Sequence, residues 1–162
     1  MEKKYRNIII FLGVFLVVVF TLMIIFLKDN SLKYEDDNYG FNYGSNFNVS
    51  LKNDNYIVSE KGGNAEIIIS ILIDDYKKSV TNEDKANLIS KEMLSEDYEK
   101  VSANCLDTFC MNVYENEDKH ITITTQFMDK DIFVYKLICD KEDSELYNED
   151  LDIIVNSFVK MK

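Results

Sequence analysis

The sequence predicts an α+β domain, an antiparallel sheet flanked by helices in an α/β/α sandwich, attached to an N-terminal transmembrane helix. Three observations lead to this prediction: an uncharged apolar stretch near the N-terminus, short aromatic and β-branched runs separated by turn residues, and two later segments with apolar residues at helical spacing. The chain has 162 residues, of which 46% are hydrophobic. Behind the apolar stretch there is room for one compact domain.

The apolar stretch covers residues 8–27 and spans about 30 Å as a helix. Basic residues concentrate in the stub before it, residues 1–7, and acidic residues follow soon after Lys28. The positive-inside rule therefore predicts a single-pass plasma-membrane protein with a cytoplasmic N-terminus and an extracytoplasmic remainder. Because no small-residue cleavage site follows the stretch, we expect an uncleaved signal anchor.

The charge of the predicted extracytoplasmic part is strongly negative. Residues 28–162 carry 15 Lys and 28 acidic residues, a formal charge of −13, and Arg6 is the only arginine of the chain. Such an acidic surface argues against a nucleic-acid partner. Residues 28–38 are polar and lack hydrophobic periodicity, so we expect a linker there and a domain over residues 39–162.

The first half of this domain predicts strands. Turn residues such as Gly44 separate the runs, and the last run, AEIIISILI, is apolar at both parities. We therefore expect that last run to be a central strand covered on both faces. The predicted strands are residues 39–43, 47–51, 56–59 and 65–73.

The second half predicts a helix, an antiparallel meander and a closing helix. Thr81, with Asp84 three residues later, resembles an N-terminal cap, and Asp143 or Ser144 would cap the closing helix. The connections within the meander are short, which requires antiparallel neighbours. The expected elements are a helix over 81–98, strands over 100–105, 109–115, 120–127 and 132–139, and a helix over 144–160.

Two local patterns resemble the PsbP-like family. Residues 39–49, YGFNYGSNFNV, are similar to the opening hairpin of that family, and the segment from Tyr147 to the pair Ser157-Phe158 is similar to its closing helix. Gly44 or Ser45 stands where the family usually has proline. The resemblance implies an antiparallel sheet flanked by helices, and it implies binding or assembly roles more often than catalysis. It brings no catalytic residue to this chain.

Cys105 and Cys110 form the sharpest local pattern, CLDTFC. A two-residue turn at Asp107-Thr108 would place the two cysteines opposite each other, within reach of a disulfide, and an extracytoplasmic compartment permits oxidation. An odd loop that matches the apolar parity of the two strands would instead leave two buried thiols, and the sequence leaves both alternatives open. Cys139 lies in an apolar strand and is expected to be a small core residue.

His120 is the only histidine, and it starts a predicted strand, where a lone histidine is usually solvated. No spacing typical of zinc, calcium or nucleotide sites occurs, so we expect no metal, no cofactor and no catalytic residue. The hypothesis that follows is a non-catalytic, membrane-anchored binding or accessory domain that recruits an envelope protein or a small ligand. The alternative is a membrane-anchored hydrolase that uses His120 with a neighbouring acid.

The aromatic opening of the domain offers a candidate partner surface. Aromatic side chains act as anchors in many protein interfaces, and here four of them lie close together in the sequence. Packing of the same side chains into the core is the competing interpretation. The candidate residues are Tyr39, Phe41, Tyr43 and Phe47.

Overall fold

The computed structural model describes residues 31–77, 79–95 and 97–161. Within them no helix is long and apolar enough to cross a membrane. The predicted stub and the predicted span over residues 8–27 lie outside the described residues. In chain order the elements are β1 (Ser31–Glu35), β2 (Tyr39–Gly44), β3 (Phe47–Lys52), β4 (Asn55–Glu60), β5 (Glu66–Ile73), α2 (Asn82–Met93), β6 (Glu99–Leu106), β7 (Phe109–Glu115), β8 (Lys119–Met128), β9 (Asp131–Asp140), the 3₁₀ turn η1 (Lys141–Asp143), α3 (Ser144–Ser157) and β10 (Val159–Lys160).

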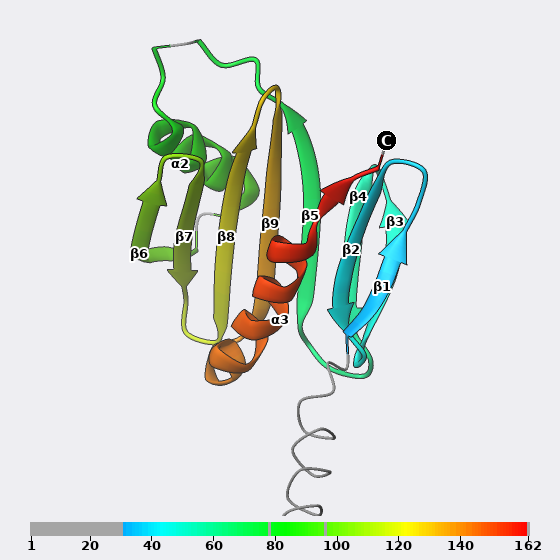
Figure 1. Ribbon diagram of the computed structural model, residues 1–162. Helices are drawn as coiled ribbons and strands as arrows, with labels where there is room; N and C mark the ends of the chain where they lie inside the picture. Colours follow the sequence, from blue (N-terminus) through cyan, green and yellow to red (C-terminus); the bar gives the residue numbers. More distant parts are fainter. Residues whose placement is uncertain (1–30, 78, 96, 162) are drawn as a thin grey trace, which may run out of the picture. The chain divides into compact units, whose positions relative to one another are not determined.

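The main sheet has seven antiparallel strands in the order β3-β4-β5-β9-β8-β7-β6. Tight hairpins join β3 to β4 and form the meander from β6 to β9, as the short connections predict. The chain leaves the sheet after β5 and returns at the far edge as β6, and α2 lies in this crossover (Figure 1).

Alternate residues of β9 divide the core between the two faces of this sheet. Phe133, Tyr135 and Leu137 belong to one apolar cluster, together with α3. Ile132 and Val134 belong to the other, together with α2. A strand with both faces buried loses the polar alternation of a half-exposed strand, which is the pattern that predicts a central position.

A second sheet, β1-β2-β10, shares the face of the main sheet on which α3 lies. Phe41 of β2 packs against Tyr56 of β4, with ring centroids 5.8 Å apart, and stacks on Phe158 at 5.7 Å. Helix α3 contacts β2 and β9. We call this side of the domain, defined by the cluster around Phe41, Tyr56 and Tyr135, the aromatic half.

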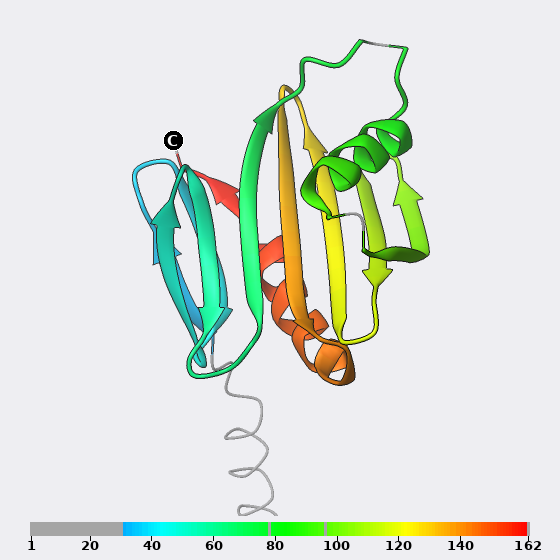
Figure 2. The same ribbon diagram turned by 180° about the vertical axis from the view of Figure 1, so that it is seen from behind.

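Helix α2 covers the opposite face, over β7 and β8 (Figure 2). Ala86 and Ile89 face the sheet and are buried. The predicted cap is present, since the Asp84 backbone N–H donates to Thr81 Oγ1 at 3.1 Å. We call this side, defined by α2 and the cluster around Ile89, Cys110 and Ile123, the α2 half.

The structure differs from the sequence prediction in several places. Residues 31–35, predicted as part of the linker, form β1 and pair with β2, so the folded unit begins at Ser31. Asp143 occupies the N-cap of α3, but its side chain makes no capping hydrogen bond. Within β5, Ile67 and Ile69 are buried, whereas Ile73 at the strand end is 76% exposed because neither helix reaches it.

Candidate functional site

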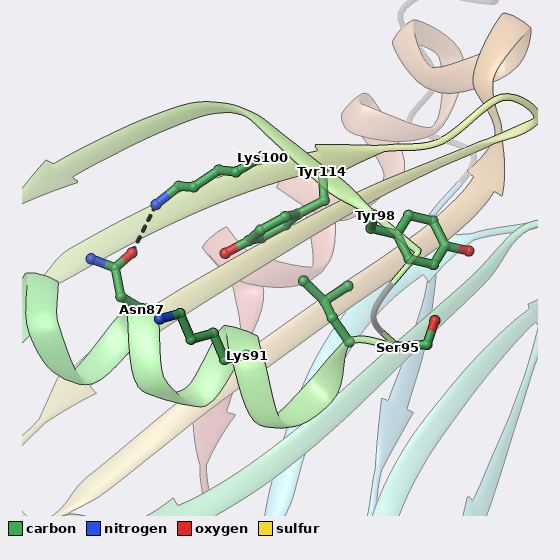
Figure 3. A pocket seen from close by; sticks show the side chains of 7 residues that line it. Asn87, Lys91, Ser95, Tyr98, Lys100 and Tyr114 are labelled. Carbon is green, nitrogen blue, oxygen red and sulfur yellow. Dashed lines mark hydrogen bonds between the residues drawn. The ribbon is translucent and has the colours of Figure 1, made fainter.

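The candidate site is a pocket of about 530 Å³ in the α2 half, between the C-terminal part of α2 and the strands β6 and β7 (Figure 3). Its walls come from the helix, the segment that follows it and the two strands. Seven residues line it: Asn87, Lys91, Leu94, Ser95, Tyr98, Lys100 and Tyr114.

One side of the C-terminal part of α2 forms the first wall of the pocket. Asn87, Lys91 and Leu94 recur at intervals of four and three residues, so they share one side of the helix end, beside the stripe that packs on the sheet. Ile89 and Ser90 anchor that stripe, and both are buried. The Asn112 amide of β7 donates to Ser90 Oγ at 3.1 Å, which ties the helix to the strand beneath the pocket.

A bulge in β6 sets the second wall. The hairpin pairs Cys105 with Cys110, and the register shifts between Lys100 and Ser102. Without that shift Val101 would lie opposite Tyr114, but the bulge places Lys100 there instead. Because of the extra residue, Lys100 rather than Val101 lies opposite Tyr114.

The polar groups of the pocket are only partly satisfied. Lys100 Nζ donates to Asn87 Oδ1 at 2.8 Å. Lys91 and the Tyr114 hydroxyl make no hydrogen bond or ion pair with any residue that the structure describes, and Tyr114 is 6% exposed. The terminal carbonyl of α2, at Met93, is bonded by Lys136 Nζ at 2.7 Å, so Lys91 is not engaged with it.

The two cysteines of the β6-β7 hairpin are joined in a disulfide. A two-residue turn at Asp107-Thr108 puts them in register, and both pack against the cluster beneath α2. The parity argument for an odd loop fails because β6 is an exposed edge strand, on which Val101 is 53% exposed and packs no core. Cys139 is a buried free thiol, and burial raises its pKa to about 11.

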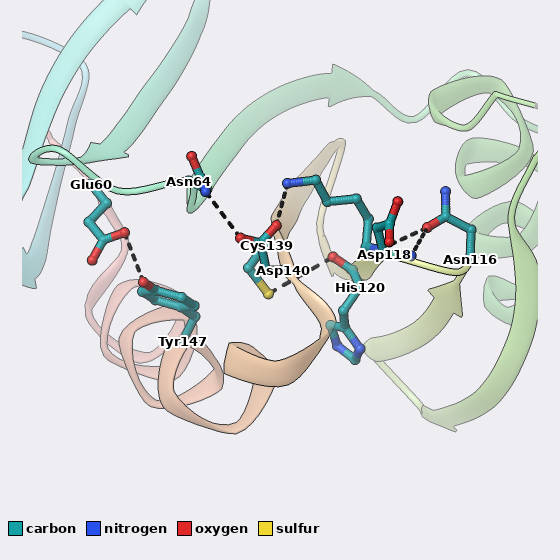
Figure 4. Close-up of polar contacts among 9 residues, drawn as sticks. Glu60, Asn64, Asn116, Asp118, His120, Cys139, Asp140 and Tyr147 are labelled. Carbon is teal, nitrogen blue, oxygen red and sulfur yellow. Dashed lines mark hydrogen bonds and ion pairs between the residues drawn. The ribbon is translucent and has the colours of Figure 1, made fainter.

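His120 lies at the end of the sheet next to η1 (Figure 4). Its Nδ1 is 3.2 Å from Glu115 Oε1 and its Nε2 is 2.9 Å from Thr122 Oγ1. The side chain is buried rather than solvated, and Thr122 is only 1% exposed. Hydrogen bonds from Lys141 and His120 lower the pKa of Glu115. The acid that the hydrolase alternative needs is present, but the hydroxyl on the other side of the ring is closed to substrate.

The other polar contacts in this region tie elements together. Asp140 accepts from Lys119 Nζ at 2.5 Å and from Asn64 Nδ2 at 3.1 Å. The Tyr147 hydroxyl of α3 donates to Glu60 at 2.8 Å, and this bond raises the pKa of Tyr147 to about 12 (Figure 4). Within the described ranges no group of three or more His, Cys, Asp or Glu side chains is placed to hold a metal ion.

The predicted aromatic partner surface is wrong for two of its four residues. Phe41 and Phe47 are each 1% exposed, because β2 and the start of β3 close over the α3 face of the main sheet. Tyr39 and Tyr43 are half-buried at the edge of the same cluster. Tyr39 stacks on Phe158 with centroids 5.4 Å apart.

A larger depression, of about 1010 Å³, lies at the β8-β9 turn beside β10. Its floor is apolar, with Phe133 and Phe158, and its Lys160 is paired with Asp131 at 2.9 Å. The pocket beside α2 differs because none of its described lining residues is acidic, whereas Asp129 and Asp131 line the larger depression. Sequence reasoning missed that pocket, since its residues come from three separated segments, and only the lysine in the last turn of α2 was visible as a local signal.

The sequence matches no protein-family model and no curated protein. Comparison of structures does find relatives. The solution structure of cyanobacterial PsbP (CyanoP) from Synechocystis superposes with a TM-score of 0.60 at 13% identity, over 83% of this chain and 95% of that chain. A crystal structure from Bacteroides thetaiotaomicron gives a TM-score of 0.53 at 13% identity and covers 83% of this chain, which spans about half of that protein (50%). The chain therefore has a PsbP-like fold, in agreement with the resemblance seen in its sequence.

Proposed function

We propose that this protein is a membrane-anchored extracytoplasmic domain that binds a protein partner or a small ligand at the cell envelope and has no catalytic activity of its own. The observation that carries the binding role is the pocket beside α2, where two lysines and a tyrosine hydroxyl lie unpaired with any acid of the described chain. A binding site needs a few convergent polar groups on an apolar wall, and this pocket has both.

Two further observations support the location outside the membrane. The apolar residues 8–27, preceded by basic residues, have the pattern of a signal anchor. The Cys105–Cys110 disulfide is typical of an oxidising compartment. An anchor also concentrates the domain near other membrane proteins, so that even a weak contact would be occupied.

The buried state of His120 favours binding over hydrolysis. A nucleophile must reach the substrate, whereas Thr122, the only hydroxyl side chain bonded to the ring among the described residues, is 1% exposed. The pair of Glu115 and His120 instead bridges the β7-β8 turn, with Lys141 bonded to the same carboxylate at 2.6 Å.

The location can be tested by counting free thiols in cells. Growing cells are quenched with acid, and denatured protein is alkylated with a mass-tagged maleimide. The full chain should take one tag, at Cys139, because Cys105 and Cys110 are bonded. The matched control lacks residues 8–27, stays in the cytoplasm and should take three tags. Three tags on the full chain would contradict the proposed location.

A further inference from the structure

The pocket beside α2 has a local charge opposite to that of the domain around it. Residues 28–162 have a formal charge of −13, yet among the described residues the pocket is lined by Lys91 and Lys100 and by no acidic side chain. The neighbouring acids point elsewhere: Asp97 and Glu99 line a separate depression together with Glu115. The contrast favours an anionic occupant.

A further described acid at this helix end is Glu92, while Glu96 lies outside the described residues. It lies next to Lys91 in sequence but does not line the pocket. Burial, with the carboxylates of Glu92, Asp75 and Asp74, raises the pKa of Tyr76, which places Glu92 toward Tyr76. Neither pocket lysine is neutralised by it, since no ion pair joins Glu92 to Lys91 or Lys100 in the described chain.

Tyr114 adds a third hydrogen-bond donor to the pocket. The residue is 6% exposed, its ring packs in the cluster under α2, and its hydroxyl has no hydrogen-bond partner among the described residues. Figure 3 shows this hydroxyl pointing into the pocket, on the side where Lys100 meets Asn87. Because the hydroxyl faces the pocket, it can donate a hydrogen bond to a ligand there.

The donors and the walls together define the ligand. Two ammonium groups and one hydroxyl can donate to the two oxygens of a carboxylate, and lysines act as point charges that suit this group. Leu94 and the rings of Tyr98 and Tyr114 form the apolar part of the lining. A volume of about 530 Å³ is that of a small-molecule site.

We propose that this pocket binds a small organic acid, whose carboxylate lies between Lys91, Lys100 and the Tyr114 hydroxyl and whose apolar body contacts Leu94 and Tyr98. This inference rests on the proposed binding function and names its ligand class. Asn87 orients the Lys100 ammonium toward the carboxylate through the 2.8 Å hydrogen bond. The β6 bulge is then a feature of the site, because it brings Lys100 opposite Tyr114.

The test uses purified full-length chain in neutral detergent and 4-fluorobenzoate as the probe, followed by ligand-observed ¹⁹F NMR. We expect saturable binding. Lys91→Gln and Lys100→Gln should each weaken it about fivefold, and Tyr114→Phe, which removes only the hydroxyl, about threefold. The matched control Lys52→Gln removes the same charge from an exposed strand outside the pocket and should leave the affinity unchanged.

Each competing outcome would overturn the inference. Equal binding of the neutral isostere 4-fluorobenzamide would show that the pocket does not recognise the negative charge of the ligand. Equal competition by inorganic phosphate would show that the apolar wall contributes nothing. An equal loss in Lys52→Gln, or no saturable binding by the wild type, would show that the pocket is not an organic-acid site. The thiol count tests location independently, so a failure of ligand binding and a failure of the proposed location give different results.

Discussion

The two halves of the domain are built on opposite faces of one sheet and are stabilised differently. In the aromatic half, Phe158 lies within 5.3 to 6.5 Å of five other rings, measured between centroids. In the α2 half, polar and covalent links supplement the apolar cluster: the disulfide, the Asn112–Ser90 hydrogen bond and the ion pair between Lys85 Nζ and Asp74 at 2.6 Å. Both halves carry a depression, but the depression of the first half has Phe133 and Phe158 in its lining, whereas the pocket of the second half is lined by Lys91 and Lys100.

This difference shows how the packing of each face decides which side chains line the depression on it. Aromatic packing gains from the exclusion of water, so the depression beside it has an apolar floor at Phe133 and Phe158. A helix held at a few polar points can stand away from the strands between those points. Asn82 donates to the Asp107 carbonyl at 2.6 Å near the start of α2, and Lys100 reaches Asn87 farther along. Asn87 and Lys100 themselves line the pocket, which extends from this second point to the C-terminal end of the helix.

The largest expected effect is in the aromatic half. Phe41→Ala removes a ring that is 1% exposed, and it should lower the free energy of unfolding by about 3–5 kcal/mol. Equilibrium urea unfolding of the full chain, followed by near-UV circular dichroism, measures this change.

Leu106→Ala is the control for this prediction, since Leu106 is 69% exposed at the tip of β6 in the α2 half. Its effect should stay within about 0.5 kcal/mol. If Phe41→Ala cost less than about 1 kcal/mol, the aromatic half would not be the main source of stability.

A smaller effect is expected from the disulfide of the α2 half. The bond joins residues five apart, so replacing both partners by Ser should lower the free energy of unfolding by about 2 kcal/mol. Hydrogen exchange should become faster at amides of β6 and β7 but not of β4 and β5. Equal acceleration in both pairs of strands would show that the two halves open together.

The parts of the fold that the sequence predicts are those set by local periodicity. The capped start of α2 and the short meander turns each depend on neighbours a few residues away, and both predictions agree with the structure. The apolar run of β5 correctly predicts an inner strand, but its last residue, Ile73, is exposed rather than covered. Strand β1 does not follow this rule. Residues 31–35 contain only two apolar side chains, Leu32 and Tyr34, a run too short to stand out in a polar segment, and they form a strand because they pair with the edge of β2.

The site is less predictable because long-range register creates it. Lys100 meets Tyr114 only through a bulge, and Lys91 joins them only because α2 crosses over the hairpin. The burial of Phe41 likewise depends on the packing of β2 over β4, and no local sequence pattern predicts that packing. The same holds for His120. Its place at a strand start predicts a solvated side chain, but Glu115 and Thr122 enclose the ring.

The smallest expected effect concerns Asp36, which links β1, the turn after it and the main sheet. Burial raises the pKa of its carboxyl, but hydrogen bonds from the backbone N–H groups of Tyr39 and Asn38 and from the Tyr56 hydroxyl, at 2.7 Å, outweigh burial and hold the pKa below its ordinary value. A lowered pKa in the folded state stabilises the fold above the unfolded value of about 3.9, and this stabilisation is lost as the pH falls through the folded pKa.

Asp36→Asn should therefore lower the free energy of unfolding at pH 6 by less than about 1 kcal/mol, because the carboxyl is partly solvated. The difference between wild type and variant should narrow toward pH 3, where the wild-type carboxyl begins to protonate. Unfolding of both proteins is measured at the two pH values. The contribution of all other carboxyls is the same in both proteins, so it cancels in the difference between them. A gap that widens on acidification would mean that the charge of Asp36 opposes the fold, and that the polar link at the edge of the aromatic half adds nothing to its ring packing.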